Sequence, residues 1–395
     1  MTEKINYTST KIASYAGLFV QAIVNNFLPI LFIALQDVYK IGYEILGRLI
    51  MFNFVTQLVT DILTPKIVGI LGYRKSAVMC QGFAALGLAM LSFLPRVLPD
   101  PYVGIVLSVV VYAFASGLME VILSPMVEML PTKNKSGNMA VLHSFYCWGQ
   151  AVTTLVTTLL VSLFGYVNWM YIPILWAIVP FINMFSFIKV PIIEPEPERK
   201  SDSLKKLLGS PLFRCFMVMM LCAGASEIAM AEWASMFAQQ ALGVTKVVGD
   251  LAGPCAFAIF MGTGRILYAR FAERLSFRKT VIVLSILCTA CYLTTALTHI
   301  PILALISCAV CGFTVSVMWP GTYSAGAKSF PRGDAVMFSV FAMCGDLGCC
   351  LGPWIIGIIA DIKSLHTGIA VASVFPIVML ITAIFFLKKD KYINK

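Results

Sequence analysis

The sequence predicts an all-α membrane protein of twelve transmembrane helices in two pseudo-symmetric six-helix bundles. Three observations indicate this fold class: few charged residues, twelve long apolar runs, and a pattern that recurs in both halves of the chain. Of the 395 residues, 59% are hydrophobic and only 12% are charged. Soluble domains carry about 25% charged residues. Too few are present here to coat a water-soluble globule, so the lipid bilayer is the expected solvent.

The apolar runs are long enough to be helices that cross a bilayer, each of which needs roughly 20 mostly apolar residues. A membrane β-barrel would instead show alternating segments of about ten residues. Open sheet edges leave backbone groups unpaired in lipid, which also favours helices. We expect spans at residues 12–35, 43–66, 76–95, 102–124, 138–164, 167–190, 212–240, 247–270, 279–298, 301–326, 333–360 and 367–387.

One polar stretch, residues 191–211, is rich in Pro and charged residues. It predicts a cytoplasmic linker between an N-terminal bundle, residues 1–190, and a C-terminal bundle, residues 212–395. Most Lys and Arg lie on the linker's side of the membrane, and this asymmetry places both termini in the cytoplasm. The opposite side carries only Lys40, Arg48, Arg96, Lys246 and Lys363.

Charge and cysteine content exclude several functions. The net charge of +10 is spread over short clusters between apolar runs, so it follows membrane topology and does not indicate nucleic-acid binding. The 12 Cys lie mostly in apolar runs, and no CxxC pair comes with His ligands, so we expect no disulfide, metal site or cofactor. No Walker, HExxH or Ser–His–Asp pattern is present, so we expect neither an ATPase nor another enzyme.

An internal repeat supports the two-bundle arrangement. The second span is followed by Leu71-Gly72-Tyr73-Arg74-Lys75 and the eighth by Leu275-Ser276-Phe277-Arg278-Lys279. Ser124-Pro125 in the fourth span corresponds to Trp319-Pro320 in the tenth. Two matches in the same order predict duplication of a six-helix unit, as in many secondary transporters.

These loops resemble the signature loop of the major facilitator superfamily. The second copy is closer to the family pattern because Glu273 stands where an Asp is usual, whereas the first copy has Gly69 there. The residues that carry this resemblance are Gly72, Arg74, Lys75, Glu273, Arg274, Arg278 and Lys279.

Within that superfamily the chain is similar to the fucose permease type of sugar–proton symporter. The resemblance implies a monomeric, multi-pass protein of a bacterial-type inner membrane, whose first, fourth, seventh and tenth helices line a cavity. The family's acidic residue in the first helix is replaced by Pro29, which leaves proton coupling, sodium coupling and uniport open. The residues that carry the similarity are Asn25-Asn26, Gly117-Leu118-Met119-Glu120, Ser124-Pro125, Leu142-His143-Ser144-Phe145, Gly149, Gly262-Thr263-Gly264-Arg265 and Trp319-Pro320.

Ionisable residues inside spans are costly and therefore indicate function. We expect Glu120 to carry the coupling proton, since burial disfavours its charged form. Glu227 is a second candidate; Glu232 lies about 140° away on the same helix, so the two cannot both face one cavity. The other ionisable residues within spans are expected to be gating or structural polar groups: Asp61, Glu128, His143, Arg265 and Asp346.

Sugar recognition needs amides or carboxylates for the hydroxyls and aromatic faces for the ring. The expected substrate-binding residues are Gln21, Asn25, Asn26, Glu120, Ser124, Trp233, Trp319 and Tyr323. The sequence therefore favours proton-coupled uptake of a small polar solute, most readily a sugar. Two alternatives stay open: proton-driven efflux of lipophilic compounds, and a non-transporting membrane sensor or scaffold.

Overall fold

The computed structural model describes residues 6–131, 135–193, 204–271, 275–330 and 334–385. All regular elements in these ranges are helices. The chain divides into two compact units, which are described one at a time. Unit 1 contains Met1–Tyr39 and Thr56–Pro197, and unit 2 contains Lys40–Val55 and Glu198–Lys395. The start of one long helix thus belongs to unit 2, although its remainder belongs to unit 1.

Unit 1 holds the first half of the chain. Its core is built on α1, which packs against α4, α5 and α6. The hydroxyl of Thr10 donates to the carbonyl of Pro191 at 2.5 Å, so the first and last described segments of the unit are in contact. Its elements are α1 (Thr8–Ile30), α2 (Phe32–Tyr39), most of α3 (Tyr43–Val97), α4 (Pro101–Glu128), α5 (Lys135–Phe164), the 3-10 turn η1 (Tyr166–Tyr171) and α6 (Ile172–Lys189).

The first span is bent by 44° where α1 gives way to α2. Pro29 lies in the last turn of α1. It has no N–H for the carbonyl one turn earlier and its ring crowds that carbonyl, which breaks a helix. Pro29 therefore shapes the first span.

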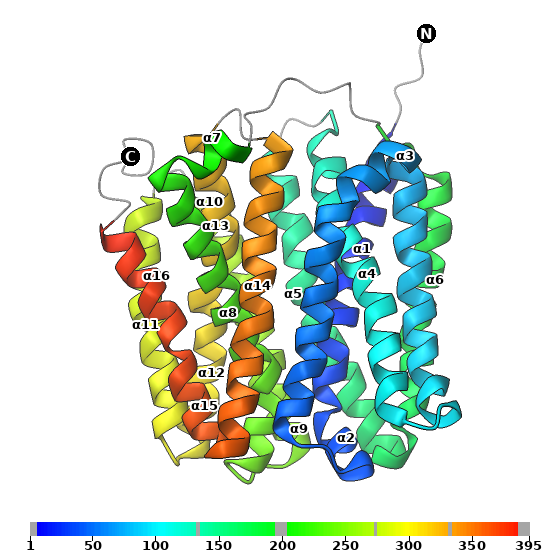
Figure 1. Cartoon of the computed structure of the whole chain (residues 1–395), viewed down its shortest axis with the longest axis vertical. Helices are drawn as coiled ribbons and strands as arrows, with labels where there is room; N and C mark the ends of the chain where they lie inside the picture. Colours follow the sequence, from blue (N-terminus) through cyan, green and yellow to red (C-terminus); the bar gives the residue numbers. More distant parts are fainter. Residues whose placement is uncertain (1–5, 132–134, 194–203, 272–274, 331–333, 386–395) are drawn as a thin grey trace. The chain divides into compact units, whose positions relative to one another are not determined.

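Two expected spans, 43–66 and 76–95, form one helical element in the structure, α3, with 55 residues. The element reverses direction at Gly72. Figure 1 shows the two arms that meet at this turn, the first in blue and the second in light blue. Gly72 has φ 74° and ψ 169°. Residues with a Cβ avoid this region, which explains a glycine at the centre of the signature loop.

Unit 2 contains the second half of the chain and the start of α3. In it α8 packs most extensively against α14 and also against α16 and α13. Its elements are α7 (Leu204–Leu208), α8 (Pro211–Gln240), α9 (Lys246–Asp250), η2 (Leu251–Cys255), α10 (Ala256–Phe271), α11 (Phe277–Leu297), α12 (Pro301–Val315), α13 (Met318–Ser329), α14 (Asp334–Ile362), α15 (Leu365–Ala372) and α16 (Val374–Phe385).

Three expected spans of unit 2 are interrupted. The eighth contains the π-helical turn η2 with Gly253 and Pro254. The tenth is divided between α12 and α13 at Ser316 and Val317, and the twelfth between α15 and α16 at Ser373. Proline cannot donate to a helix ladder, so Pro254 accounts for the first break; π-turns are frequent at functional sites.

The helices are sufficient for a multi-pass membrane protein. Among the described residues, ten helices are long and apolar enough to cross a membrane, and the bent pair α1–α2 makes an eleventh. The two arms of α3 together have a helical length of about 80 Å, more than twice the hydrocarbon thickness. Counting its two arms separately is consistent with the twelve expected spans.

Glycines allow α8 and α14 to approach closely. A Cβ on Gly352 would lie 3.0 Å from the carbonyl oxygen of Ala225, and one on Gly348 would collide with the carbonyl of Leu221. Small residues at helix crossings are typical of membrane proteins, where packing rather than the hydrophobic effect holds helices together. This contact fixes the position of the acidic residues that α8 carries.

Candidate functional site

Two predicted residues, Gln21 and Glu120, meet in unit 1 between α1 and α4. Gln21 is 5% exposed. Its amide donates to Glu120 Oε2 at 3.1 Å and to the carbonyl of Ser116 at 3.4 Å. Ser116 and Glu120 are four residues apart and lie on one face of α4. The contact holds one oxygen of the half-buried Glu120 carboxyl against a neutral amide.

Asn25 lies in a polar cluster one turn further along α1. Ser116 Oγ is 3.0 Å from Asn25 Oδ1 and 2.8 Å from Gln57 Oε1, and its single proton serves one of them at a time. Gln57 Nε2 donates to Asn25 Oδ1 at 3.2 Å. All three side chains are buried. Sequence analysis missed Gln57 and Ser116, although an amide within an apolar span was an available signal for Gln57.

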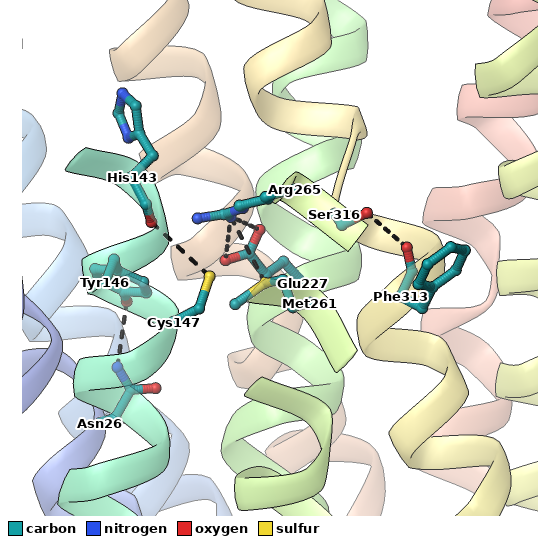
Figure 2. A network of polar contacts seen from close by, with 9 residues as sticks. All are labelled: Asn26, His143, Tyr146, Cys147, Glu227, Met261, Arg265, Phe313 and Ser316. Carbon is teal, nitrogen blue, oxygen red and sulfur yellow. Dashed lines mark hydrogen bonds and ion pairs between the residues drawn. The ribbon is translucent and has the colours of Figure 1, made fainter. Parts of the chain in front are cut away.

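The second asparagine of the pair makes different contacts. Successive helical residues are about 100° apart, so Asn26 faces α5 rather than α3. Its amide donates to the hydroxyl of Tyr146 at 3.3 Å and to the carbonyl of Ala22 at 2.9 Å, as Figure 2 shows for Tyr146. Tyr146 was not predicted. The tandem asparagines therefore contact three neighbouring helices: Asn25 contacts α3 and α4, and Asn26 contacts α5.

The other predicted residues of unit 1 are more dispersed. Ser124 Oγ lies 3.5 Å from Nε2 of the half-buried His143, which links α4 to α5. Asp61 is fully buried on α3. Glu128 is the last residue of α4, and its side chain lies outside what the structure describes.

Glu227 and Arg265 form a buried ion pair in unit 2, between α8 and α10 (Figure 2). Arg265 Nη2 lies 3.1 Å from Glu227 Oε2 and 3.3 Å from Oε1, and it also touches the sulfur of Met261 at 3.6 Å. The two side chains are 10% and 9% exposed. The sequence predicted Glu227 as a proton-coupling residue and Arg265 as a gating or structural polar residue, and it left the partner of Arg265 open.

Trp233 and Glu232 lie in the C-terminal half of α8, after Glu227. The ring of Trp233 is fully buried, and its N–H donates to the carbonyl of Pro353 on α14 at 3.0 Å. In this state the predicted substrate-binding indole is engaged in packing α8 against α14. Glu232 is 3% exposed, and neither of its carboxyl oxygens has a hydrogen-bond partner among the described residues.

The aromatic residues of the tenth span lie together on α13. The ring centroids of Trp319 and Tyr323 are 6.1 Å apart. Tyr323 stacks on Phe338 of α14 at 5.4 Å. Trp319 lies against Gly345, where any Cβ would collide with the indole. Asp346, the next residue of α14, is 2% exposed.

The two signature loops act alike in their own units. Arg74 donates to the carbonyls of Phe187 at 3.0 Å and Ile188 at 2.7 Å, near the end of α6. Arg278 donates to the carbonyls of Ala383 at 3.3 Å and Ile384 at 3.0 Å, near the end of α16. Each arginine thus satisfies carbonyls that a helix end leaves unpaired.

The remaining loop residues are peripheral. Lys75 and Lys279 are exposed, and Glu273 and Arg274 lie outside the described residues. Within the described ranges, no group of three or more His, Cys, Asp or Glu side chains could hold a metal ion.

One family model matches most of the chain. The sequence profile described as Major Facilitator Superfamily matches residues 14–353 and 254–394. No curated protein matches the sequence closely enough to count as a relative.

Solved structures share the fold at low sequence identity. The crystal structure of the E. coli fucose:proton symporter FucP is 16% identical, with a TM-score of 0.69 over 96% of this chain and 98% of that one. A D-xylose–proton symporter is 12% identical, with a TM-score of 0.79 over 98% and 99% of the two chains.

Proposed function

Because this chain belongs to the Major Facilitator Superfamily and is a multi-pass membrane transporter, not an enzyme, we propose that it takes up a small polar solute, most readily a sugar, together with protons. The transporter would work by alternating access, as expected for the family. The observation that carries the proposal is the buried polar cluster of unit 1, in which Gln21 holds Glu120 beside Asn25, Gln57 and Ser116.

The chemistry of this cluster suits hydroxylated solutes. Amides and a carboxyl present both donors and acceptors, which sugar hydroxyls require. Such groups are expensive to bury unless they are hydrogen-bonded, and here they bond one another. A hydroxyl of the solute would replace one of these bonds rather than create a new polar burial. The fold is also shared by a fucose:proton symporter and a D-xylose–proton symporter.

Glu120 is the proposed carrier of the coupling proton. Its Oε2 accepts from the Gln21 amide, and this bond is stronger to the ionised carboxylate than to the neutral carboxyl. A solute hydroxyl, unlike the Gln21 amide nitrogen, can accept a hydrogen bond, so it would pair with the O–H of a protonated Glu120 carboxyl. Binding of solute and proton would then assist each other, which is the reciprocity that symport requires.

The Glu227–Arg265 pair and the aromatic residues of α13 have proposed roles in unit 2. A proton arriving at Glu227 would remove the charge that holds Arg265, and so open the contact between α8 and α10. Trp319 and Tyr323 offer an aromatic surface against which a sugar ring would pack.

A ligand-dependent melting shift on detergent-purified protein tests the substrate class. The panel contains monosaccharides, oligosaccharides, amino acids and lipophilic cations, each in acidic and neutral buffer. A ligand at about 100 times its dissociation constant stabilises the protein by about 2.7 kcal/mol. We expect a sugar to raise the melting temperature, with a shift that depends on pH.

Variants separate binding at the cluster from other effects. Ser116→Ala should weaken the sugar response, and Glu44→Gln, which removes an exposed carboxylate from α3, should leave it unchanged. A response confined to lipophilic cations would replace sugar uptake with efflux of lipophilic compounds. No response to any solute under either condition would contradict the proposed substrate class.

A further inference from the structure

The carboxyl of Glu232 is isolated in the interior of unit 2. It is 3% exposed, and neither oxygen has a hydrogen-bond partner among the described residues. Glu227, five residues earlier on α8, shows the opposite arrangement, because both of its oxygens lie within 3.3 Å of the Arg265 guanidinium. One helix thus carries two buried acids, one with a counter-ion and one without.

The helix that follows α8 in the chain, α9, does not supply a counter-ion to Glu232. The ammonium of Lys246 pairs with Asp250 Oδ2 at 2.8 Å. Asp250 also accepts from the hydroxyl of Ser235, which lies one turn beyond Glu232. The charges on α9 therefore balance one another, and Ser235 is used by Asp250.

The helices α14 and α15 bring further ionisable groups to α8. Asp361 accepts from the backbone N–H groups of Tyr43 and Glu44, and Asp346 is a second acid on α14. On α15, Nδ1 of His366 lies 2.8 Å from the carbonyl of Ala296.

The remaining elements that pack on α8 provide no partner either. Lys205 and Lys206 of α7 and Lys328 of α13 are exposed, and the described parts of η2, α12 and α16 carry no Lys, Arg, His, Asp or Glu. Among the described residues, no cation therefore lies within ion-pairing distance of Glu232.

A bare carboxylate in such a place is far more costly than a neutral carboxylic acid. We propose that Glu232 is a proton-binding site of unit 2: its carboxyl holds a proton in the conformation shown, while Glu227 stays ionised beside Arg265. Buried polar groups without partners require a physical explanation, and a bound proton supplies it with the atoms present. Sequence analysis had favoured Glu227 of the two acids.

The site is held in place by the packing of α8. Trp233 donates to the carbonyl of Pro353 on α14, and Ser235 donates to Asp250 on α9, so the turn of α8 that follows Glu232 is bonded to two neighbouring helices. Water would reach the carboxyl, and allow it to release the proton, when these contacts open. As a coupling device this inference rests on the proposed function, but proton occupancy itself can be measured without any substrate.

Infrared spectroscopy of the full-length protein tests the proton directly. A protonated carboxyl has a C=O stretch that is separate from those of ionised carboxylates. Near neutral pH, Glu232→Gln should remove one such band and Glu232→Asp should shift it. Glu227→Gln and the exposed control Glu44→Gln should leave the band in place.

Carbodiimide labelling provides a second test on the wild-type chain, which does not depend on how the variants fold. The apolar reagent dicyclohexylcarbodiimide adds the O–H of a protonated carboxyl across its C=N bond, and the acyl group then migrates to nitrogen as a stable adduct. Peptide mapping should find the adduct on Glu232, in amounts that fall as the pH rises, and none on Glu227.

Two results would overturn the inference. The first is a spectrum in which Glu232→Gln removes only ionised carboxylate absorption, together with an unlabelled Glu232. The second is protection of Glu232 by added sodium at constant pH, which would mean that a metal cation occupies the site. Either result would leave the sugar response of the melting assay untouched, so failure here is distinguishable from failure of the proposed function.

Discussion

Removal of one partner of the Glu227–Arg265 pair should destabilise the protein more than most single substitutions. The guanidinium and carboxylate are 3.1 Å apart, and the side chains are 10% and 9% exposed. At an effective dielectric constant of about 20, this separation corresponds to an attraction of about 5 kcal/mol. Desolvation offsets much of that attraction in the intact pair, but a single substitution leaves an uncompensated buried charge and costs about 3–5 kcal/mol.

The assay is thermal unfolding of detergent-purified variants. At about 2–4 °C per kcal/mol for a unit of this size, Glu227→Gln and Arg265→Gln should each lower the melting temperature by roughly 6 °C or more. The double variant Glu227→Leu with Arg265→Met replaces both charges by apolar groups and should recover most of the loss. Glu44→Gln breaks the exposed Arg48–Glu44 pair and serves as the matched control, with an expected change within about 1 kcal/mol.

A double-mutant cycle measures the interaction free energy between Glu227 and Arg265. We expect a value well above 1 kcal/mol, since the residues are in direct contact and buried. Single variants as stable as the wild type, or a coupling as small as that of the Arg48–Glu44 pair, would refute the assignment of a desolvated ion pair at this position.

Three further outcomes can be checked by the same unfolding assay. Gly72→Ala forces a Cβ into the conformation with φ 74° and should cost about 1–3 kcal/mol of stability. Gly69→Ala, with no atoms near the added methyl, should be neutral or stabilising, and equal losses of stability in the two variants would contradict the strain argument. Ser116→Ala removes the one hydroxyl proton that the buried oxygens of Asn25 and Gln57 share, and among the described residues only Asn25 Oδ1 keeps a donor, the amide of Gln57. The loss should cost about 1–3 kcal/mol, so an unchanged stability would show that the cluster is hydrated. Arg74→Gln removes the donor to two carbonyls at the end of α6 and should cost about 1–3 kcal/mol, and a neutral result would mean that water serves these carbonyls equally well.

The fold was predictable because lipid imposes simple rules on sequence. Spans must be long and apolar, and loops must carry the charges, so the positions of the helices follow from composition along the chain. The signature loops were recognisable from Gly72 and its neighbours, since a reversal with positive φ needs glycine. The sequence also indicated that Gln21 and Glu120 belong to one polar site, and the structure places them in contact.

Interruptions within spans were harder to predict. Pro29 was noticed as a substitution for an acid, but its 44° bend depends on how the chain after it packs. The π-turn at η2 contains Gly253 and Pro254, residues that also occur in continuous membrane helices. Local sequence therefore gave weak signals for breaks that tertiary packing decides.

Which side chains contact one another across helices could not be predicted from the sequence, for the same reason. Arg265 lies 38 residues from Glu227, and hydropathy does not determine the rotation of α10 relative to α8. Gln57 of α3 and Tyr146 of α5 are likewise polar residues whose partners depend on how their helices are rotated. The isolation of Glu232 is likewise a property of the packed unit rather than of α8 alone.

The most direct test of the central claim is solute uptake by proteoliposomes containing the wild type or Glu120→Gln, with an imposed proton gradient. The Gln side chain cannot carry the coupling proton but keeps the size of the Glu120 side chain beside Gln21. We expect the variant to exchange labelled solute across the membrane while failing to accumulate it against a concentration gradient, as the wild type does. Accumulation by Glu120→Gln at the wild-type level would contradict proton coupling through this residue.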